Sequence, residues 1–497
     1  MTSEAYQDAT VARAYDANGR LVHVNDSAGG VFDFTYDLAG HLLSSASPFG
    51  AVQYSYDMAG RVTSRQVAGQ SALAYLYDPA GNLLSASLPQ ASVNFAYDVR
   101  SQLTSLTRAN GVTSQYVYDN DGRVLSITDS GGSRVLNSQT YTYDPVGNRS
   151  THTTNIAQPL ITQATSNIYD VANRLVQSVT DGMTLYTYDA NGNLTSATGP
   201  SGATTYTWDS RNRLASIAGS NGQTTNFQYD FRGNLIAQTD TGPVLNLTQD
   251  FILDHRTNLA YIDRSNGDSL PVLTGRSIDQ HLAVVHSIGQ VEYGLTDASN
   301  STTATLDQTG KLLASFSYEP FGETTNPVGS EYPFRFTGRV PTVGKLYYYR
   351  ARYYDSLAGR FIRQDPTGLR GDVNLYRYVR NNPLRYADPL GLDNFTVYNS
   401  SGTSNGFPFS LYNSSGQPIG FPQPVYPLYV QSPEEQSEQN CEETCELAFN
   451  DLGSLKPPFD TVAYVGSLGC PVYCTPYGRA GLKGGFNAAC RTFGFGF

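Results

Sequence analysis

A tyrosine–aspartate pair recurs through the first half of the chain at a nearly constant interval, and this repeat constrains the fold more than any other feature. Most steps between the aspartates are 19 to 21 residues long. Eleven units align from AYDANGRL to QYDFRGNL, with Asp at positions 16, 37, 57, 78, 98, 119, 144, 170, 189, 209 and 230. A period of about 20 residues matches two short strands and two turns, so each unit predicts one β-hairpin.

Each residue type of the unit YTYDANGNL has a structural use. Tyr186 and Tyr188 alternate, which places both rings on one face of a strand. Asp189 can accept hydrogen bonds from its own turn, Gly192 supplies a positive φ, and Leu194 starts the next strand. We therefore interpret Tyr and Asp as turn and packing residues. The alternative is a row of sugar or ion sites, but no unit carries the carboxylate cluster that calcium needs.

A lone hairpin cannot bury its apolar face, so successive units must pair edge to edge. The prediction is an all-β fold in which successive hairpins form one continuous sheet, and a sheet of this size must curl or close to remove its edges. The 36 Tyr, 47 Gly and 15% charged residues favour such a structure with many tight turns. Two longer steps, around residues 130 and 155, are rich in Ser, Thr, Gly and Asn and predict extended loops.

The charge and hydropathy of the chain argue against nucleic-acid binding and against a membrane-spanning segment. A formal net charge of −11 argues against nucleic-acid binding by the shell. No apolar run approaches the roughly 20 residues of a transmembrane helix. The first residues, MTSEAYQDATVARAYD, also lack the apolar region of a secretory signal. This favours either export by another route or descent from the tail of a longer chain.

The Tyr-Asp spacing is lost from about residue 286, and a dense aromatic and arginine-rich segment follows. It reads FRFTGRVPTVGKLYYYRARYYDSLAGRFIRQDPTGLRGDVNLYRYVRNNPLRYADPLGL over 334–392. The repeats and this segment resemble the Rhs/YD-repeat family, including the Rhs repeat-associated core, Tc-toxin C components and teneurin YD shells. The resemblance covers about residues 10–392 and implies a β-sheet strip that spirals into a hollow shell.

The resemblance also implies an organisation and a function. Residues 1–240 are expected to form the YD-repeat shell, 241–285 a connecting β segment, 286–392 the Rhs core, and 393–497 a variable C-terminal module. The implied protein is a bacterial polymorphic toxin, secreted or on the cell surface without a conventional signal peptide. Its shell would enclose the C-terminal module as cargo, with secretion machinery or an immunity protein as further partners.

Members of that family cleave their own chain after the leucine of the DPxGL motif. By resemblance the bond here is Leu392–Asp393, and the two aspartates and one arginine that the family uses map onto Asp365, Asp388 and Arg352. Hydrolysis by aspartates needs one ionised carboxylate to activate water and one protonated carboxyl to donate, and two close carboxyls share a proton.

An arginine beside such a pair can steady the charge or hold the segment. The resemblance therefore implies a single-turnover aspartate autoprotease. A Ser or Cys protease is disfavoured, because the core has no Cys and no His follows His286. We predict neither a cofactor nor a resident metal in the shell or the core.

The C-terminal module has no repeat, and it contains all five cysteines. Its segment PEEQSEQNCEETCELAFNDLG predicts a helix. This segment contains the first CxxxC pair, Cys441 and Cys445, and a second pair, Cys470 and Cys474, comes later in the chain. Two disulfides, a four-thiolate metal site, a catalytic cysteine and free thiols all stay open, with Cys490 unpaired in the first two. Disulfides between the pairs are the preferred interpretation.

Two rival functions also stay open at this point. The chain could be a surface repeat protein that is never cleaved and serves adhesion or carbohydrate contact. It could equally be a decayed fragment of a larger Rhs protein whose C-terminus is inert.

Overall fold

The computed structural model describes residues 2–156, 165–180, 182–324, 332–370, 372–392 and 395–396. These residues form β-strands and three short 3-10 helices, and they contain no α-helix. The predicted all-β class is therefore confirmed. The helix and the cysteines predicted in the C-terminal module lie outside the described residues. The described part of the chain has no helix with the length and hydropathy of a transmembrane span.

Fifteen antiparallel strands in chain order form the first sheet, and each strand pairs with its neighbours in sequence. They are β1 (Thr2–Ala5), β2 (Thr10–Tyr15), β3 (Leu21–Asp26), β4 (Gly30–Tyr36), β5 (Leu42–Ser47), β6 (Gly50–Tyr56), β7 (Val62–Val67), β8 (Leu73–Tyr77), β9 (Leu83–Ser87), β10 (Ser92–Tyr97), β11 (Leu103–Arg108), β12 (Val112–Tyr118), β13 (Val124–Gly131), β14 (Arg134–Tyr143) and β15 (Arg149–Thr154).

The second sheet repeats this plan with another fifteen strands. They are β16 (Ser166–Tyr169), β17 (Leu175–Val179), β18 (Met183–Tyr188), β19 (Leu194–Gly199), β20 (Gly202–Trp208), β21 (Leu214–Gly219), β22 (Thr224–Tyr229), β23 (Leu235–Thr241), β24 (Leu247–Leu253), β25 (Leu259–Arg264), β26 (Leu270–Thr274), β27 (His281–Val285), β28 (Val291–Thr296), β29 (Thr302–Leu306) and β30 (Leu312–Ser315).

Smaller elements follow and form the core segment. They are η1 (Phe336–Gly338), β31 (Leu346–Tyr349), β32 (Arg352–Asp355), β33 (Arg360–Phe361), η2 (Gly368–Arg370), η3 (Val379–Asn381), β34 (Tyr386–Ala387) and β35 (Phe395–Thr396). Strands β31 to β33 make a three-stranded sheet, and β34 pairs with β35.

The aspartate of each repeat closes its own turn. In the unit at Asp57 the backbone N–H of Asp57 donates to the Arg61 carbonyl at 3.0 Å. The carboxylate accepts the backbone N–H groups of Ala59 and Arg61 at 2.9 and 3.0 Å, and Nε of Arg61 at 2.6 Å. Gly60 takes the positive φ of +73° that ends the turn. The predicted turn chemistry is thus present in this unit.

The aromatic residue before the aspartate joins one hairpin to the previous one in most repeats. The Tyr118 hydroxyl donates to the Leu103 carbonyl at 2.8 Å, and Trp208 makes the same bond to Leu194 through its indole N–H at 2.7 Å. Equivalent bonds to a Leu or Val carbonyl come from Tyr36, Tyr56, Tyr77, Tyr97, Tyr143, Tyr188 and Tyr229. Tyr and Asp therefore act as packing and turn residues.

The loop predicted around residue 130 is wrong. This longer step extends β13 and β14 to 8 and 10 residues instead. Asp129 is buried in the hairpin, where its carboxylate accepts a hydrogen bond from Ser114 and another from Asn137 at 2.8 Å. The sequence resembled a loop because its polar residues form hydrogen bonds with one another and with β12 inside the sheet. The other longer step includes residues 157–164, which lie outside the described residues.

Hairpins of the same kind continue where the Tyr-Asp spacing is lost. Asp254, Asp297 and Asp307 each close a turn by donating their N–H to the carbonyl four residues later, at 2.9 Å. Because the aspartate makes the turn bonds, the turn persists after the tyrosine is lost. The boundaries at 240, 285 and 392 remain predictions.

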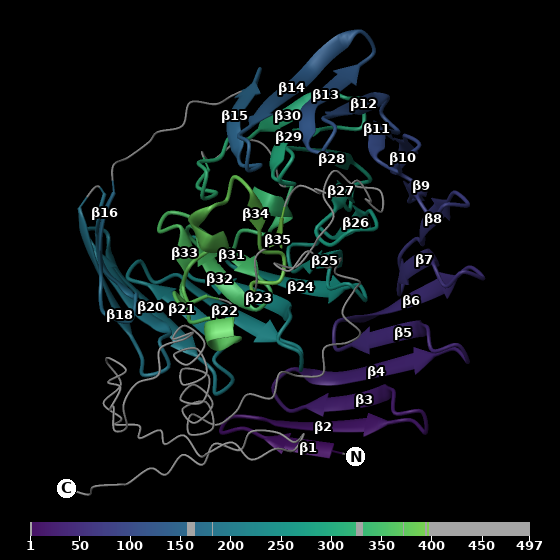
Figure 1. Cartoon of the computed structure of the whole chain (residues 1–497). Helices are drawn as coiled ribbons and strands as arrows, with labels where there is room; N and C mark the ends of the chain where they lie inside the picture. Colours follow the sequence, from purple (N-terminus) through teal and green to yellow (C-terminus); the bar gives the residue numbers. More distant parts are fainter. Residues whose placement is uncertain are drawn as a thin grey trace, which may run out of the picture. The chain divides into compact units, whose positions relative to one another are not determined.

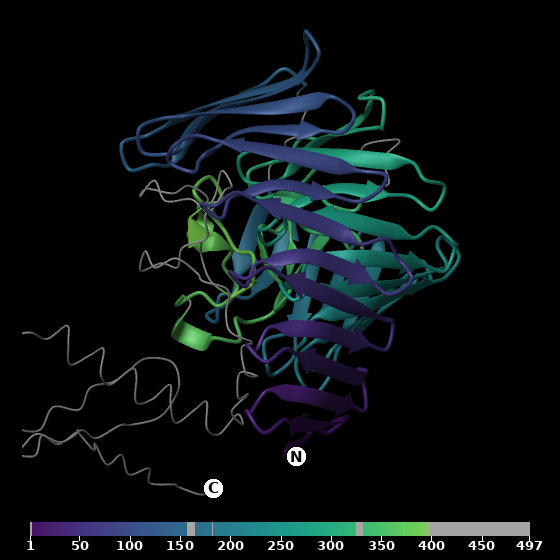
Figure 2. The same cartoon turned by 90° about the vertical axis from the view of Figure 1, so that its right-hand side faces the viewer.

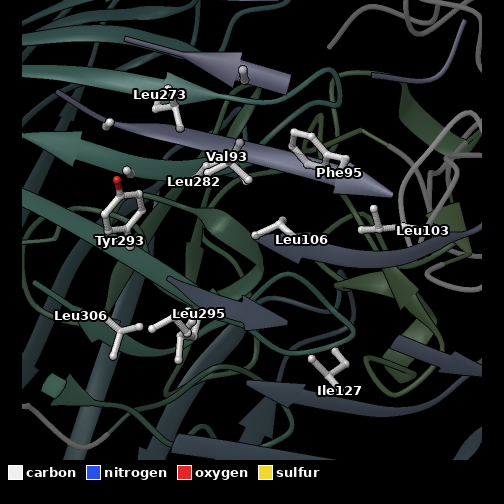
Figure 3. Packing of buried hydrophobic residues seen from close by; sticks show 14 of the residues in the cluster. Val93, Phe95, Leu103, Leu106, Ile127, Leu273, Leu282, Tyr293, Leu295 and Leu306 are labelled. Atoms are coloured by element: carbon white, nitrogen blue, oxygen red, sulfur yellow. The ribbon is translucent and has the colours of Figure 1, made fainter. Parts of the chain in front are cut away.

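Strands β26 to β29 are buried on both faces. Leu273 of β26 belongs to the same buried cluster as Val93 and Leu106 of the first sheet, and Figure 3 shows the three side chains within it. The neighbouring residue Val272 belongs to a second buried cluster, which includes Tyr353 of the core segment. This part of the second sheet therefore lies between the first sheet and the core segment, which removes the polar alternation from β26 to β29.

The two sheets form an open shell within residues 2–315. In Figure 1 the first sheet rises along the right side from β1, and the second passes from β16 on the left to β30 at the top. Figure 2 shows the strands of the first sheet one above another, in the order of the chain. Within these two described sheets, β1, β15, β16 and β30 pair with a neighbour on one side only, so neither sheet closes on itself.

Candidate active site

The three residues predicted to cleave the chain lie together. Arg352 begins β32, Asp365 follows β33, and Asp388 follows β34. Nη2 of Arg352 is 2.8 Å from Oδ2 of Asp365 and 3.4 Å from Oδ2 of Asp388. All three residues are buried, with 3%, 8% and 2% of their surface exposed. One guanidinium nitrogen thus bridges two carboxylates from different elements.

Contacts on every side fix the Arg352 guanidinium. It stacks on the Phe361 ring at 3.6 Å from the ring centroid. Nη1 donates to the Leu375 carbonyl at 3.2 Å, and Nε donates to the Gly391 carbonyl at 2.5 Å. Burial lowers the pKa of Arg352, and the two carboxylates raise it. Arginine stays protonated in proteins, so the site holds a fixed positive charge.

Asp365 is held with one oxygen directed at Arg352. Its Oδ1 accepts the backbone N–H of Thr367 at 2.8 Å and the Thr367 hydroxyl at 2.6 Å. The Arg352 guanidinium and the two Thr367 donors therefore hold both oxygens of the Asp365 carboxylate in place.

Asp388 contacts the segment that precedes the predicted cleavage bond. Its Oδ1 accepts the backbone N–H of Leu392 at 3.1 Å. The carbonyl of Leu390 accepts the backbone N–H of Ala351 at 3.1 Å, and the carbonyl of Gly391 accepts from Arg352. The main chain is therefore held up to Leu392, while Asp393 lies outside the described residues.

Gly391 cannot carry a side chain in this position. Its φ is +69°, and a Cβ atom would overlap the Tyr349 carbonyl oxygen and lie 3.1 Å from the backbone nitrogen of Arg352. The glycine of the DPxGL motif thus allows the segment to approach the turn between β31 and β32.

Three further residues hold this segment, and the sequence patterns did not indicate them. Arg350 donates to the Pro389 carbonyl at 2.5 Å, and Arg339 donates to the same carbonyl. The Asp279 carboxylate accepts both arginines, at 2.9 Å from Arg350 and 2.7 Å from Arg339. Arg350 stands in the motif RARYYD, but Asp279 lies far away in a turn that matches no motif, so sequence alone gave no sign of their contact.

The core segment contacts a row of main-chain carbonyls. Each carbonyl comes from one of five successive turns along one edge of the second sheet, from the β16–β17 turn to the β24–β25 turn. We call this the carbonyl row. It consists of the residues with positive φ, which are Asn173, Gly192, Asn212, Gly233 and Thr257. Their donors are, in the same order, Arg360, Tyr376, Arg363, Tyr348 and Arg350. The core segment therefore contacts the repeat through its backbone, which depends little on the turn sequence.

No cluster of three metal-ligating side chains occurs within the described ranges. Of the predicted site residues, the disulfide candidates Cys441, Cys445, Cys470 and Cys474 lie outside those ranges.

Hairpins joined by tyrosine bonds, with a core segment on their turns, define a class of β-shell proteins. The family model described as Teneurin YD-shell matches residues 2–136 and 114–384. The chain belongs to this family.

The chain is also similar to a nuclease and to a toxin subunit over parts of its length. The tRNA nuclease WapA of Bacillus subtilis (strain 168) is 28% identical over 285 residues, which is 50% of this chain and 11% of WapA. Toxin subunit YenC2 of Yersinia entomophaga is 35% identical over 109 residues, which is 21% of this chain and 11% of the subunit. The chain thus spans about a tenth of the length of these relatives.

Solved structures with the same fold include two TcdB2-TccC3 crystal structures. The TcdB2-TccC3-TEV structure matches 77% of this chain and 25% of its own, with a TM-score of 0.60 and 20% identity. The TcdB2-TccC3 structure matches 77% of this chain and 27% of its own, with a TM-score of 0.58 and 19% identity. At this identity the likeness shows the fold.

Proposed function

We propose that this chain is a toxin-type YD-shell protein that cuts itself once, after Leu392, and so frees residues 393–497 as cargo. The observation that supports this most is the buried contact of Arg352 with Asp365 and Asp388. Asp388 also accepts the Leu392 N–H, which brings the pair to the predicted bond.

The proposed reaction is peptide hydrolysis by an aspartate pair. Ionised Asp365 takes a proton from water, and the water oxygen bonds to the Leu392 carbonyl carbon. Protonated Asp388 gives its proton to the Asp393 nitrogen as the C–N bond breaks. The products are a Leu392 carboxylic acid, which then releases its proton to solvent, and an Asp393 amine. Asp365 ends with the proton taken from water, and Asp388 ends ionised.

Arg352 supports this reaction through its charge. The guanidinium already donates to the Gly391 carbonyl, one residue before the reacting carbonyl. A fixed cation there lowers the cost of the negative charge that develops on the Leu392 oxygen. Because the site is buried, the effect of this charge is larger than it would be in water.

We also propose that the freed cargo acts on another cell after export. Relatives named as toxin subunits and as tRNA nucleases support this role. Residues 393–497 contain no histidine, so a histidine-dependent nuclease is not the proposed activity.

One gel tests the cleavage. Purified wild-type chain should migrate as fragments of about 390 and 105 residues, from the predicted bond. Asp365→Asn and Asp388→Asn should each leave a single band. Intact wild-type protein would refute the proposal, as would cleavage that persists in both variants. A toxicity assay then compares wild type with Asp388→Asn, since cargo that must be freed harms cells only from the wild-type chain.

A further inference from the structure

The turn that follows the carbonyl row differs from the five before it. Between β26 and β27 the residue with positive φ is Asp279, at +61°. Aspartate tolerates this conformation, because its short polar side chain fits the left-handed region. Here the core segment contacts a carboxylate instead of a carbonyl, and that carboxylate binds Arg339 and Arg350 together.

We propose that Asp279 is a positioning residue for self-cleavage, a role that rests on the proposed function. It fixes the two arginines that hold the Pro389 carbonyl, and Pro389 directly follows Asp388. Asp279 contacts the two arginines, and the arginines contact the Pro389 carbonyl. Asp279 thus connects a turn of the second sheet to the segment that precedes the Leu392–Asp393 bond.

The surroundings of Asp279 make this connection rigid. Asp279 is 6% exposed, its N–H donates to the Asn258 side chain at 2.7 Å, and its carbonyl accepts from the Asn300 side chain at 2.7 Å. Neighbouring turns on both sides therefore fix its backbone. Because its backbone is fixed, the Asp279 carboxylate sets the positions of the two arginines that bind it.

The charged groups that face Asp279 are few, so the effect of its removal has a definite sign. They are Arg339, Arg350 and His281, and burial lowers the pKa of His281 to about 3, which leaves that ring neutral. Without the Asp279 charge, the Arg339 and Arg350 guanidiniums lose their paired carboxylate and raise the positive potential at Asp388. A positive potential favours ionised Asp388, which must be protonated to donate, so the alkaline side of the pH–rate profile should move to lower pH.

The test follows the first-order conversion of newly synthesised full-length chain into fragments across a pH series. Asp279→Asn should cleave at least tenfold more slowly than wild type, since small displacements at a reacting centre cost rate steeply. Its alkaline limb should lie at lower pH. Asp121→Asn is the matched control, because it removes a carboxylate–arginine pair at 3.1 Å from a turn of the first sheet.

The outcomes separate this inference from the proposed function. Wild-type cleavage with an Asp279→Asn variant of equal rate and equal pH profile overturns the role of Asp279 alone. A wild-type chain that stays intact overturns both. Slow cleavage without movement of the alkaline limb would also contradict the charge argument.

A second variant covers the case in which Asp279→Asn does not fold. Arg350→Gln leaves the Asp279–Arg339 pair in place and should slow cleavage in the same direction. If both single variants fold, the double variant should lose less than the product of the two separate effects, because both act through one contact. Independent effects, or wild-type rate in Arg350→Gln, would contradict the proposal.

Discussion

The tyrosine hydroxyl is the part of the repeat that joins one hairpin to the next. Tyr118→Phe removes its bond to the Leu103 carbonyl and leaves a buried acceptor without that donor. We expect a loss of about 1 kcal/mol in the free energy of unfolding. Denaturant titration measures it. Tyr15→Phe is the control, since Tyr15 is 36% exposed and no hydrogen bond of its hydroxyl occurs among the described residues. Equal losses in both variants would contradict this role.

The aspartates of the repeat should make stability depend on acid pH. The backbone N–H of Arg61, followed by its side chain, holds the pKa of Asp57 below its ordinary value of 3.8. A lowered folded-state pKa gives stability that is present above 3.8 and is lost as the pH falls through the folded-state value. Asp57→Asn should therefore lower the melting temperature at pH 7, and the difference from wild type should shrink below pH 3.8. A difference that grows in acid would reverse the sign of this argument.

At the scale of single elements, the segment before the cleavage bond depends on one glycine. Gly391→Ala places a Cβ against the Tyr349 carbonyl, so the segment cannot dock on the turn before β32. We expect self-cleavage to be lost while the shell stays folded. Gly344→Ala is the matched control, because its φ of +66° carries the same strain but its Cβ would meet no atom within 4 Å. Cleavage of Gly391→Ala at the rate of Gly344→Ala would contradict the docking.

Single hairpins could be predicted from the sequence because their information is local. Asp57, Ala59, Gly60 and Arg61 form a closed set of contacts within five residues, and the same set recurs at the repeat period. The hairpin around residue 130 was missed, because Asp129 is satisfied by Ser114 and Asn137 across strands. Such contacts depend on register, which composition does not reveal.

At the scale of the whole fold, buried arginines connect the two sheets. Arg65 of the first sheet donates to the Val272 carbonyl of the second at 2.7 Å and lies 3.5 Å from buried Asp254. Arg65→Leu removes the ion pair of that buried carboxylate, so we expect a loss of about 3–5 kcal/mol. Arg100→Leu removes an exposed pair with Asp98 and should cost less than about 1 kcal/mol. Chemical unfolding measures both, and similar losses would contradict the connection.

The site could be predicted only in part for the same physical reason. Arg352, Asp365 and Asp388 belong to one long motif, and their resemblance to a known core indicated them together. Asp279 lies in a turn of the second sheet, far in sequence from the core segment, and the two meet only in the folded chain. No local pattern distinguishes its turn from its neighbours, because the signal is a contact with Arg339 and Arg350.

The mass of the products tests the central claim most directly. Intact mass spectrometry of the purified wild-type chain, which is 54.0 kDa uncut, should find two polypeptides whose masses match residues 1–392 and 393–497. Asp388→Asn should give the uncut mass alone. A single 54.0 kDa species from the wild type, or fragments that begin at a residue other than Asp393, would contradict cleavage by the Asp365–Asp388 pair after Leu392.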